Sequence, residues 1–161
     1  LHNHETPLQK PLKLAIKTTV PDSLQNKALI AYTNSLLSSR RGSIGGEVSN
    51  GYIHASSLSF GYFFVTVDTI PPTITPSFKD KADLRGRKEI TIKIWDDLSG
   101  IGSYNGYIDD KWVLFEYDAK RSLLIHTLDK KHTSQGKKHK LVLKVNDKKE
   151  NVATLATEFT W

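Results

Sequence analysis

Apolar side chains recur at every second position through most of this chain, and that spacing limits the fold more than any other feature. In "LKLAIK", Leu12, Leu14 and Ile16 share one face and two lysines occupy the other, and the isoleucines of "EITIKIWDD" repeat the pattern. Successive side chains of a β-strand point to opposite faces, whereas a helix repeats every 3.6 residues. The spacing therefore predicts an all-β protein with almost no helix.

Turn signals divide the pattern into short strands. Asn50-Gly51 predicts a tight hairpin because both residue types tolerate positive φ. Before residue 68, strands are predicted at 12–17, 27–33, about 43–48, 51–57 and 61–67. After it, the strand-like runs are "TITPSF", "EITIKIWDD", "IGSYNGYID", "KWVLFEYD", "SLLIHTL", "HKLVLKVND" and "VATLATEFTW". Seven short strands in about 90 residues are typical of an immunoglobulin-like or fibronectin III-like β-sandwich.

A pair of prolines, Pro71 and Pro72, separates the two sets of strands. Proline has no N–H to donate and fixes φ, so neither residue fits a central strand, and together they favour an extended, stiff connection. We therefore predict two tandem β-sandwich domains: a small all-β domain over residues 1–67 and an Ig-like domain over residues 68–161, with the proline-rich joint at 68–76.

Composition excludes several classes of protein. The net charge is +6, but it is +3 over residues 1–67 and +3 over residues 68–161, so the concentrated basic surface of a nucleic-acid binder is missing. No apolar run approaches the roughly 20 residues that span a bilayer. The chain has no cysteine, which excludes thiol catalysis, disulfides and cysteine-ligated metals. It opens on "LHNHETPLQKP" without methionine or leader, so we expect it to be part of a longer protein.

Histidines and acidic pairs are the candidates for metal chemistry. His2 and His4 form an H-x-H pair, which we interpret as part of a flexible tail. We expect the other four, at 54, 126, 132 and 139, on strand surfaces or turns. Asp96 and Asp97 are weak calcium candidates in a loop of the second domain, because calcium favours clustered loop oxygens; aspartate is also a common turn former. Asp109-Asp110 is expected in a hairpin turn, and we predict no cofactor.

Two surfaces are candidates for binding. The first is an aromatic group, Trp95, Tyr104, Tyr107 and Trp112, which would either stack on sugar rings or cover the sheets. The second is a basic patch, Lys130, Lys131, Lys137, Lys138 and Lys140, which would either grip a polyanion or form a solvated loop. The chain contains no G-x-S-x-G, phosphate-loop or H-E-x-x-H motif, and this favours a binding or structural role over catalysis.

Four stretches carry a resemblance to a known family: "VPDSLQNKALI", "GGEVSNGYIHASSLSFGYFFVTVDTIPPTI", "DDLSGIGSYNGYIDDKWVLFEYD" and "HKLVLKVNDKKENVATLATEF". They are similar to the region that follows the catalytic domain in secreted lysostaphin-type zinc metallopeptidases of gut Gram-negative bacteria. Those enzymes bind zinc through H-x-x-x-D and H-x-H elements. This chain has no H-x-x-x-D, and its H-x-H at residues 2–4 lacks the glycine-rich context, so no catalytic residue transfers.

The resemblance implies non-catalytic accessory domains, a spacer and docking region, of an exported cell-wall peptidase. Its partners would be the parent's catalytic domain or cell-wall glycopeptide, and its location periplasmic, outer-membrane-associated or extracellular. The alternative is a cell-surface adhesin or glycan-binding module unrelated to a peptidase.

Overall fold

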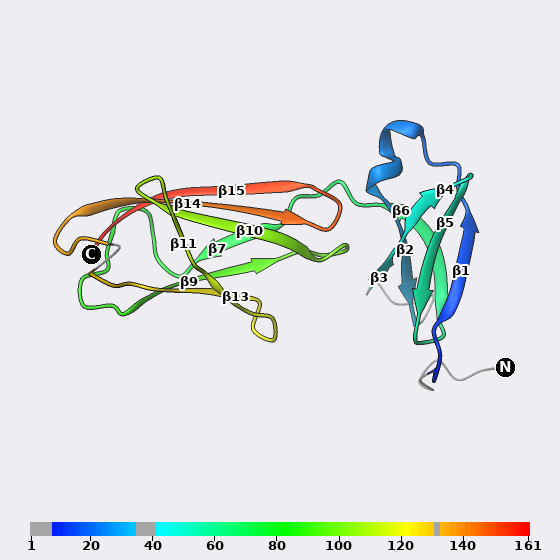
Figure 1. Cartoon of the computed structure of the whole chain (residues 1–161), viewed down its shortest axis with the longest axis horizontal. Coiled ribbons are helices and arrows are strands. Elements are labelled where there is room, and N and C mark those ends of the chain that lie inside the picture. The colour runs from blue at the N-terminus through cyan, green and yellow to red at the C-terminus, as the bar shows by residue number, and fades with distance from the viewer. Residues whose placement is uncertain (1–7, 35–40, 131–132) are drawn as a thin grey trace. The chain divides into compact units, whose positions relative to one another are not determined.

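The computed structural model describes residues 8–34, 41–130 and 133–161, and these form an all-β protein built from mainly antiparallel sheets (Figure 1). The chain divides into two compact units. The first runs to Ile70 and also includes Asp97–Gly100, and the second comprises Pro71–Asp96 and Ile101–Trp161. The described residues include no helix with the length and apolar character needed to cross a membrane.

The N-terminal unit contains two three-stranded sheets, ordered β1-β5-β4 and β3-β2-β6. Its elements are β1 (Leu12–Lys17), the 3₁₀ helix η1 (Asp22–Lys27), β2 (Ala28–Thr33), β3 (Gly42–Gly45), β4 (Glu47–Ser49), β5 (Tyr52–Ser57) and β6 (Tyr62–Val67). Ala28, Ile30 and Ile53 form its buried centre. The predicted hairpin is confirmed, because Asn50 and Gly51 have φ values of 51° and 76° and Ser49 pairs with Tyr52.

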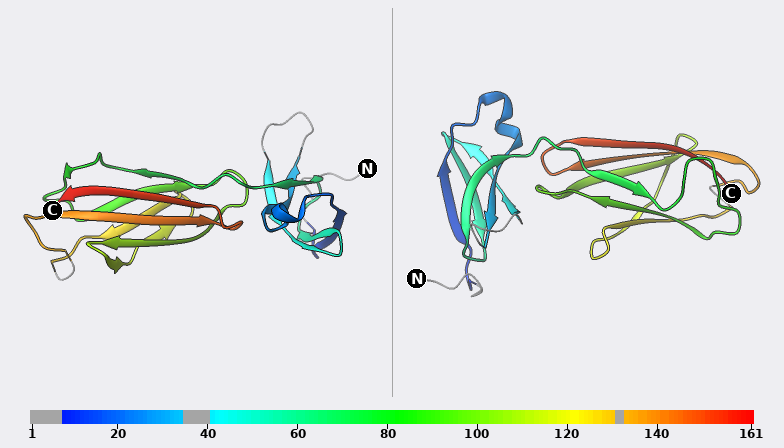
Figure 2. Two further views of the ribbon diagram at one scale, coloured as in Figure 1. Left: turned by 90° about the horizontal axis from the view of Figure 1, so that it is seen from above. Right: turned by 180° about the vertical axis from the view of Figure 1, so that it is seen from behind.

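The C-terminal unit contains a five-stranded sheet, β11-β10-β14-β15-β8, and a four-stranded sheet, β12-β13-β9-β7. Figure 2 draws its strands, coloured from green to red, in two further views. The strands are β7 (Thr73–Pro76), β8 (Ala82–Asp83), β9 (Glu89–Trp95), β10 (Ile101–Ile108), β11 (Lys111–Val113), β12 (Glu116–Asp118), β13 (Leu123–Thr127), β14 (Lys138–Asp147) and β15 (Val152–Thr160). All neighbours are antiparallel except β15 and β8.

The core of this unit lies between its sheets and follows the predicted alternation. Ile90, Ile92 and Ile94 of β9 are fully buried, and so are Leu141 and Leu143 of β14. At roughly 25 cal/mol for each Å² of apolar surface removed from water, such rows supply most of the driving force for folding. The all-β sandwich-type fold predicted from the spacing is therefore confirmed.

The run "KWVLFEYD" departs from its prediction as one strand. Residues 111–113 pair with β10 in the five-stranded sheet, whereas residues 116–118 pair with β13 in the four-stranded sheet. Leu114 and Phe115 carry the chain from one sheet to the other. Phe115 is buried in the core and Leu114 is exposed. This split and the two-residue β8 raise the seven predicted strands of the unit to nine among the described residues.

Candidate functional site

A groove of about 460 Å³ opens where the chain passes from β11 to β12 in the C-terminal unit. Its walls come from both sheets and from the crossing between them. They consist of Trp112, Val113, Leu114, Glu116, Ile125, His126, Thr127 and Asp129. A concave surface with apolar walls and a few polar groups is the usual form of a binding site.

Trp112 is placed by the hairpin that joins β10 to β11. Asp109 and Asp110 have φ values of 50° and 63°, which is the geometry of a tight two-residue turn and confirms the predicted turn. The turn sets Trp112 opposite Tyr107 in the antiparallel register. The indole Nε1 donates a hydrogen bond to Asn105 Oδ1 at 3.3 Å, and the residue remains 58% exposed. An oriented, exposed aromatic ring thus forms one wall of the groove.

His126 also lines the groove and is only 7% exposed. Its Nδ1 lies 2.8 Å from the carbonyl oxygen of Leu114. A carbonyl oxygen can only accept, so Nδ1 carries a proton and donates. The ring also packs against Phe115, with 5.3 Å between centroids. Nε2 has no hydrogen-bond partner among the described residues. His126 therefore holds the crossing of the chain through its Nδ1, and its Nε2 is buried from solvent.

The charged groups of the groove are acidic. Glu116 and Asp129 line it, and none of the lining residues that the structure describes is a lysine or an arginine. Glu116 lies beside Ile125 in the register of β12 and β13, and Thr127 lies beside Glu89 of β9. Paired residues share a face of a sheet, so a third carboxylate lies on the same outer surface. Two carboxylates therefore belong to the described lining of the groove, in a chain whose net charge is +6.

The predicted aromatic group is divided by the fold. Tyr107 and Trp112 are paired on one face of the five-stranded sheet. Tyr104 packs against the core beside Tyr117, with ring centroids 5.9 Å apart. Trp95 is 53% exposed but belongs to β9 of the other sheet. Trp112 is the one of the four that lines the groove.

The described lysines of the predicted basic patch, at 130, 137, 138 and 140, are exposed, and Lys131 lies outside the described residues. One position within this run points inward. His139 is 4% exposed, and its Nδ1 lies 2.7 Å from Asp109 Oδ2 while its Nε2 lies 2.7 Å from the carbonyl oxygen of Ser134. Burial raises the pKa of Asp109, but the Lys140 amide and the His139 ring outweigh it and lower that pKa overall. The basic patch thus includes a buried histidine, His139, that is hydrogen-bonded to Asp109 and Ser134.

The prediction that the internal histidines lie on strand surfaces or turns is wrong for two of them. His126 and His139 occupy inward positions of β13 and β14. The Nδ1 of each ring has a hydrogen-bond acceptor within reach, which offsets part of the cost of burying a polar group. His54 is exposed on β5. His2, His4 and His132 lie outside the described residues.

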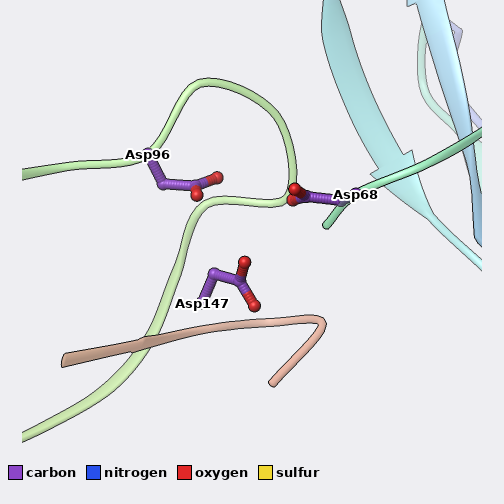
Figure 3. A group of neighbouring side chains, drawn as sticks. All are labelled: Asp68, Asp96 and Asp147. Atoms are coloured by element: carbon purple, nitrogen blue, oxygen red, sulfur yellow. The ribbon is translucent and has the colours of Figure 1, made fainter. Parts of the chain in front are cut away.

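Of the two calcium candidates, Asp97 is exposed, and Asp96 joins a group that the sequence did not reveal. Asp68, Asp96 and Asp147 each offer one carboxylate oxygen, and these atoms lie within 4.8 Å of one another (Figure 3). Asp68 accepts hydrogen bonds from the amides of Ile70 and Ser99 at 3.2 and 3.0 Å. Aspartate commonly accepts such bonds in loops. The carboxylates of Asp68 and Asp147 already accept hydrogen bonds from backbone amides, so we assign no metal to this group.

Comparison with known proteins finds a similarity to one family over less than half of the chain. Residues 1–68 match the Zu5-like domain. No curated protein matches the sequence. Among solved structures, the chain is similar to the X-ray structure of the endo-beta-1,4-mannanase from Thermotoga petrophila, with 12% sequence identity and a TM-score of 0.47. The match covers 58% of this chain and 20% of that enzyme. The chain thus spans a small part of the enzyme's length, and a similarity at this level says nothing about activity.

Proposed function

We propose that this chain is a non-catalytic docking region of an exported protein and that it binds its target through the groove at Trp112. The exposed, oriented indole of Trp112 is the observation that carries the proposal. Tryptophan is among the residues that contribute most to binding when its partner covers it, because it buries a large apolar area without losing much conformational freedom.

The second unit is, in this proposal, an Ig-like sandwich that presents the groove. The strand order supports this part of the proposal: β7-β9-β13-β12 would be strands A, B, E and D of an immunoglobulin domain, and β10, β14 and β15 would be C, F and G. Domains of this type commonly act as spacers and binding modules. The resemblance to accessory regions of cell-wall peptidases supplies the proposed context: the target is cell-wall glycopeptide or the parent's catalytic domain.

A pull-down with purified Gram-negative sacculi tests the proposal. We expect the full chain to sediment with sacculi and Trp112→Ala to weaken this binding about tenfold, the factor that corresponds to about 1.4 kcal/mol. Trp95→Ala is the matched control, because Trp95 is similarly exposed in the same unit but lies outside the groove. Equal binding by the two variants, with both folded, would remove the groove from the proposal.

The alternative is a cell-surface adhesin or glycan-binding module. The coding sequence upstream of Leu1 would distinguish it from the peptidase context. A domain with H-x-x-x-D and H-x-H elements there supports the peptidase context. Further Ig-like repeats or a lipoprotein signal there support the adhesin.

A further inference from the structure

We infer that Asn50, at the tip of the hairpin between β4 and β5, is a site of spontaneous deamidation, in which the side-chain amide is lost and aspartate and isoaspartate form. This modification concerns the N-terminal unit and does not depend on the groove at Trp112. It is carried by a comparison within the chain, because the same four residues, Asn-Gly-Tyr-Ile, occur at 50–53 and again at 105–108.

The reaction needs only the chain and water. The backbone nitrogen of Gly51 attacks Cγ of Asn50 and closes a succinimide ring, while the bond from Cγ to Nδ2 breaks and ammonia leaves with the proton of the Gly51 amide. Water then opens the ring. Cleavage between the Gly51 nitrogen and Cγ gives aspartate, whereas cleavage between that nitrogen and the main-chain carbonyl carbon gives isoaspartate. A following glycine favours the attack because it has no side chain to obstruct the nitrogen.

The turn leaves the attacking nitrogen of Gly51 accessible. Asn50 and Gly51 are both exposed, with φ values of 51° and 76°. Among the described residues the Gly51 amide has no acceptor, and the backbone bond of this residue uses its carbonyl oxygen, which accepts from the Thr18 amide at 2.9 Å. A Cβ built at Gly51 would meet no atom within 4 Å. Exposed loop tips also open at little cost in free energy, so the rotation that brings the nitrogen to Cγ is available.

At the second copy of the segment, the sheet withholds the corresponding nitrogen. Gly106 lies within β10, opposite Val113 of β11 on one side and Leu143 of β14 on the other, so its amide belongs to the ladder of hydrogen bonds. The glycine is buried, and a Cβ built on it would overlap the ring of Phe115. Attack at Asn105 therefore requires the pairing of a central strand to break.

The two products affect the hairpin differently. Aspartate fits a tight turn of this kind as asparagine does. Isoaspartate adds a carbon atom to the main chain between Ser49 and Tyr52, which pair directly across the turn. The next pair is Val48 and Ile53, and both pack in the core of the N-terminal unit. We therefore expect isoaspartate, but not aspartate, to loosen β4 and β5.

Hydrogen exchange of the β5 amides tests this structural consequence. The control is Asn50→Asp, which carries the same charge as both products and keeps the normal main chain. We expect the isoaspartyl form, separated by chromatography, to exchange at least about tenfold faster in β5 than Asn50→Asp does. Equal exchange in the two forms would overturn the loosening of β4 and β5.

Peptide mapping by mass spectrometry, with aspartyl and isoaspartyl forms resolved by chromatography, tests the site itself. The full chain is kept in mildly alkaline buffer, once folded and once unfolded in concentrated urea, and both segments are followed over days. In the folded chain we expect Asn50 to react at least about tenfold faster than Asn105, because a central strand opens far less often than a loop tip. In urea the two identical segments should react at rates within about twofold of each other.

Each of the other outcomes overturns the inference. If Asn50 stays intact in the folded chain over a time in which the unfolded chain reacts, the turn protects it. If the folded chain reacts equally at Asn50 and Asn105, the sheet gives no protection. If neither asparagine reacts in urea, the segment itself is not reactive.

Discussion

Single carboxylates stabilise loops of this molecule, and Asp147 does so most completely. The residue is buried at the end of β14. Its Oδ1 accepts hydrogen bonds from the amides of Lys149 and Asn151 at 2.7 and 2.9 Å, and its Oδ2 accepts one from Asn151 Nδ2 at 2.6 Å. One side chain therefore satisfies three donors in the turn between β14 and β15.

Replacing Asp147 by Ala should lower the free energy of unfolding by about 2–4 kcal/mol, because buried donors lose a charged acceptor. Asp147→Asn should cost less, since its remaining carbonyl oxygen can still accept. Asp97→Ala, at an exposed loop position, should stay within about 0.5 kcal/mol of the parent protein. Urea unfolding measures all three variants. A loss for Asp147→Ala as small as that for Asp97→Ala would contradict the capping role.

The alternation of inward and outward positions along a strand predicted which side chains are exposed, but it did not predict the contacts that they make. Trp95 occupies the polar face of its strand in the sequence and the outer face in the structure. Parity also places His126 with Leu124 and Leu128, so the sequence contained the signal for its burial. The acceptor that makes this burial possible is the carbonyl of Leu114, and its position depends on how the chain crosses between the sheets. That contact could not be predicted from local sequence.

At the scale of strands, the crossing between β11 and β12 depends on a residue without a side chain. A Cβ built at Gly106 of β10 would overlap the ring of Phe115. The glycine lies opposite Val113 in the register, so the absence of its side chain makes room for the phenyl ring as the chain turns toward the other sheet.

Gly106→Ala should therefore destabilise the protein by about 1–3 kcal/mol, the usual cost of overpacking a core. The relevant test is a double-mutant cycle with Phe115→Leu, which removes ring atoms at the point of overlap. We expect the two changes together to cost less than the sum of their separate costs when unfolding is followed in urea. Strict additivity would show that Gly106 is required for another reason.

The strands themselves were predictable, whereas this crossing was not. "KWVLFEYD" has uninterrupted β-propensity, and nothing within it marks a break. The break arises because residues 111–113 and 116–118 pair with strands of different sheets. The groove formed at the break could therefore not be predicted from the sequence, although Trp112, which lines it, was a predicted binding residue.

At the scale of the molecule, the two hydrophobic cores share no residue. The buried cluster of the C-terminal unit runs from Phe78 to Trp161, and that of the N-terminal unit is confined to residues before Asp68. Each core can therefore form from one continuous part of the sequence.

We expect a fragment of residues 71–161 to fold alone and to unfold cooperatively in urea, because it retains its complete core. Its tryptophan fluorescence should change in a single transition. A fragment that shows no cooperative transition, under conditions where the whole chain does, would mean that the core is insufficient without the preceding residues.

The three tryptophans give the molecule a set of internal optical reporters. All of them belong to the C-terminal unit, so tryptophan fluorescence reports on the unfolding of that unit and not on that of the N-terminal unit. Trp161 is buried, with its Nε1 directed to the carbonyl of Arg87, and reports on the packed interior. Trp112 lies at the groove and Trp95 on the open face of β9. Replacing one indole at a time would separate the spectral signatures of unfolding, ligand occupancy and bulk solvent within a single chain.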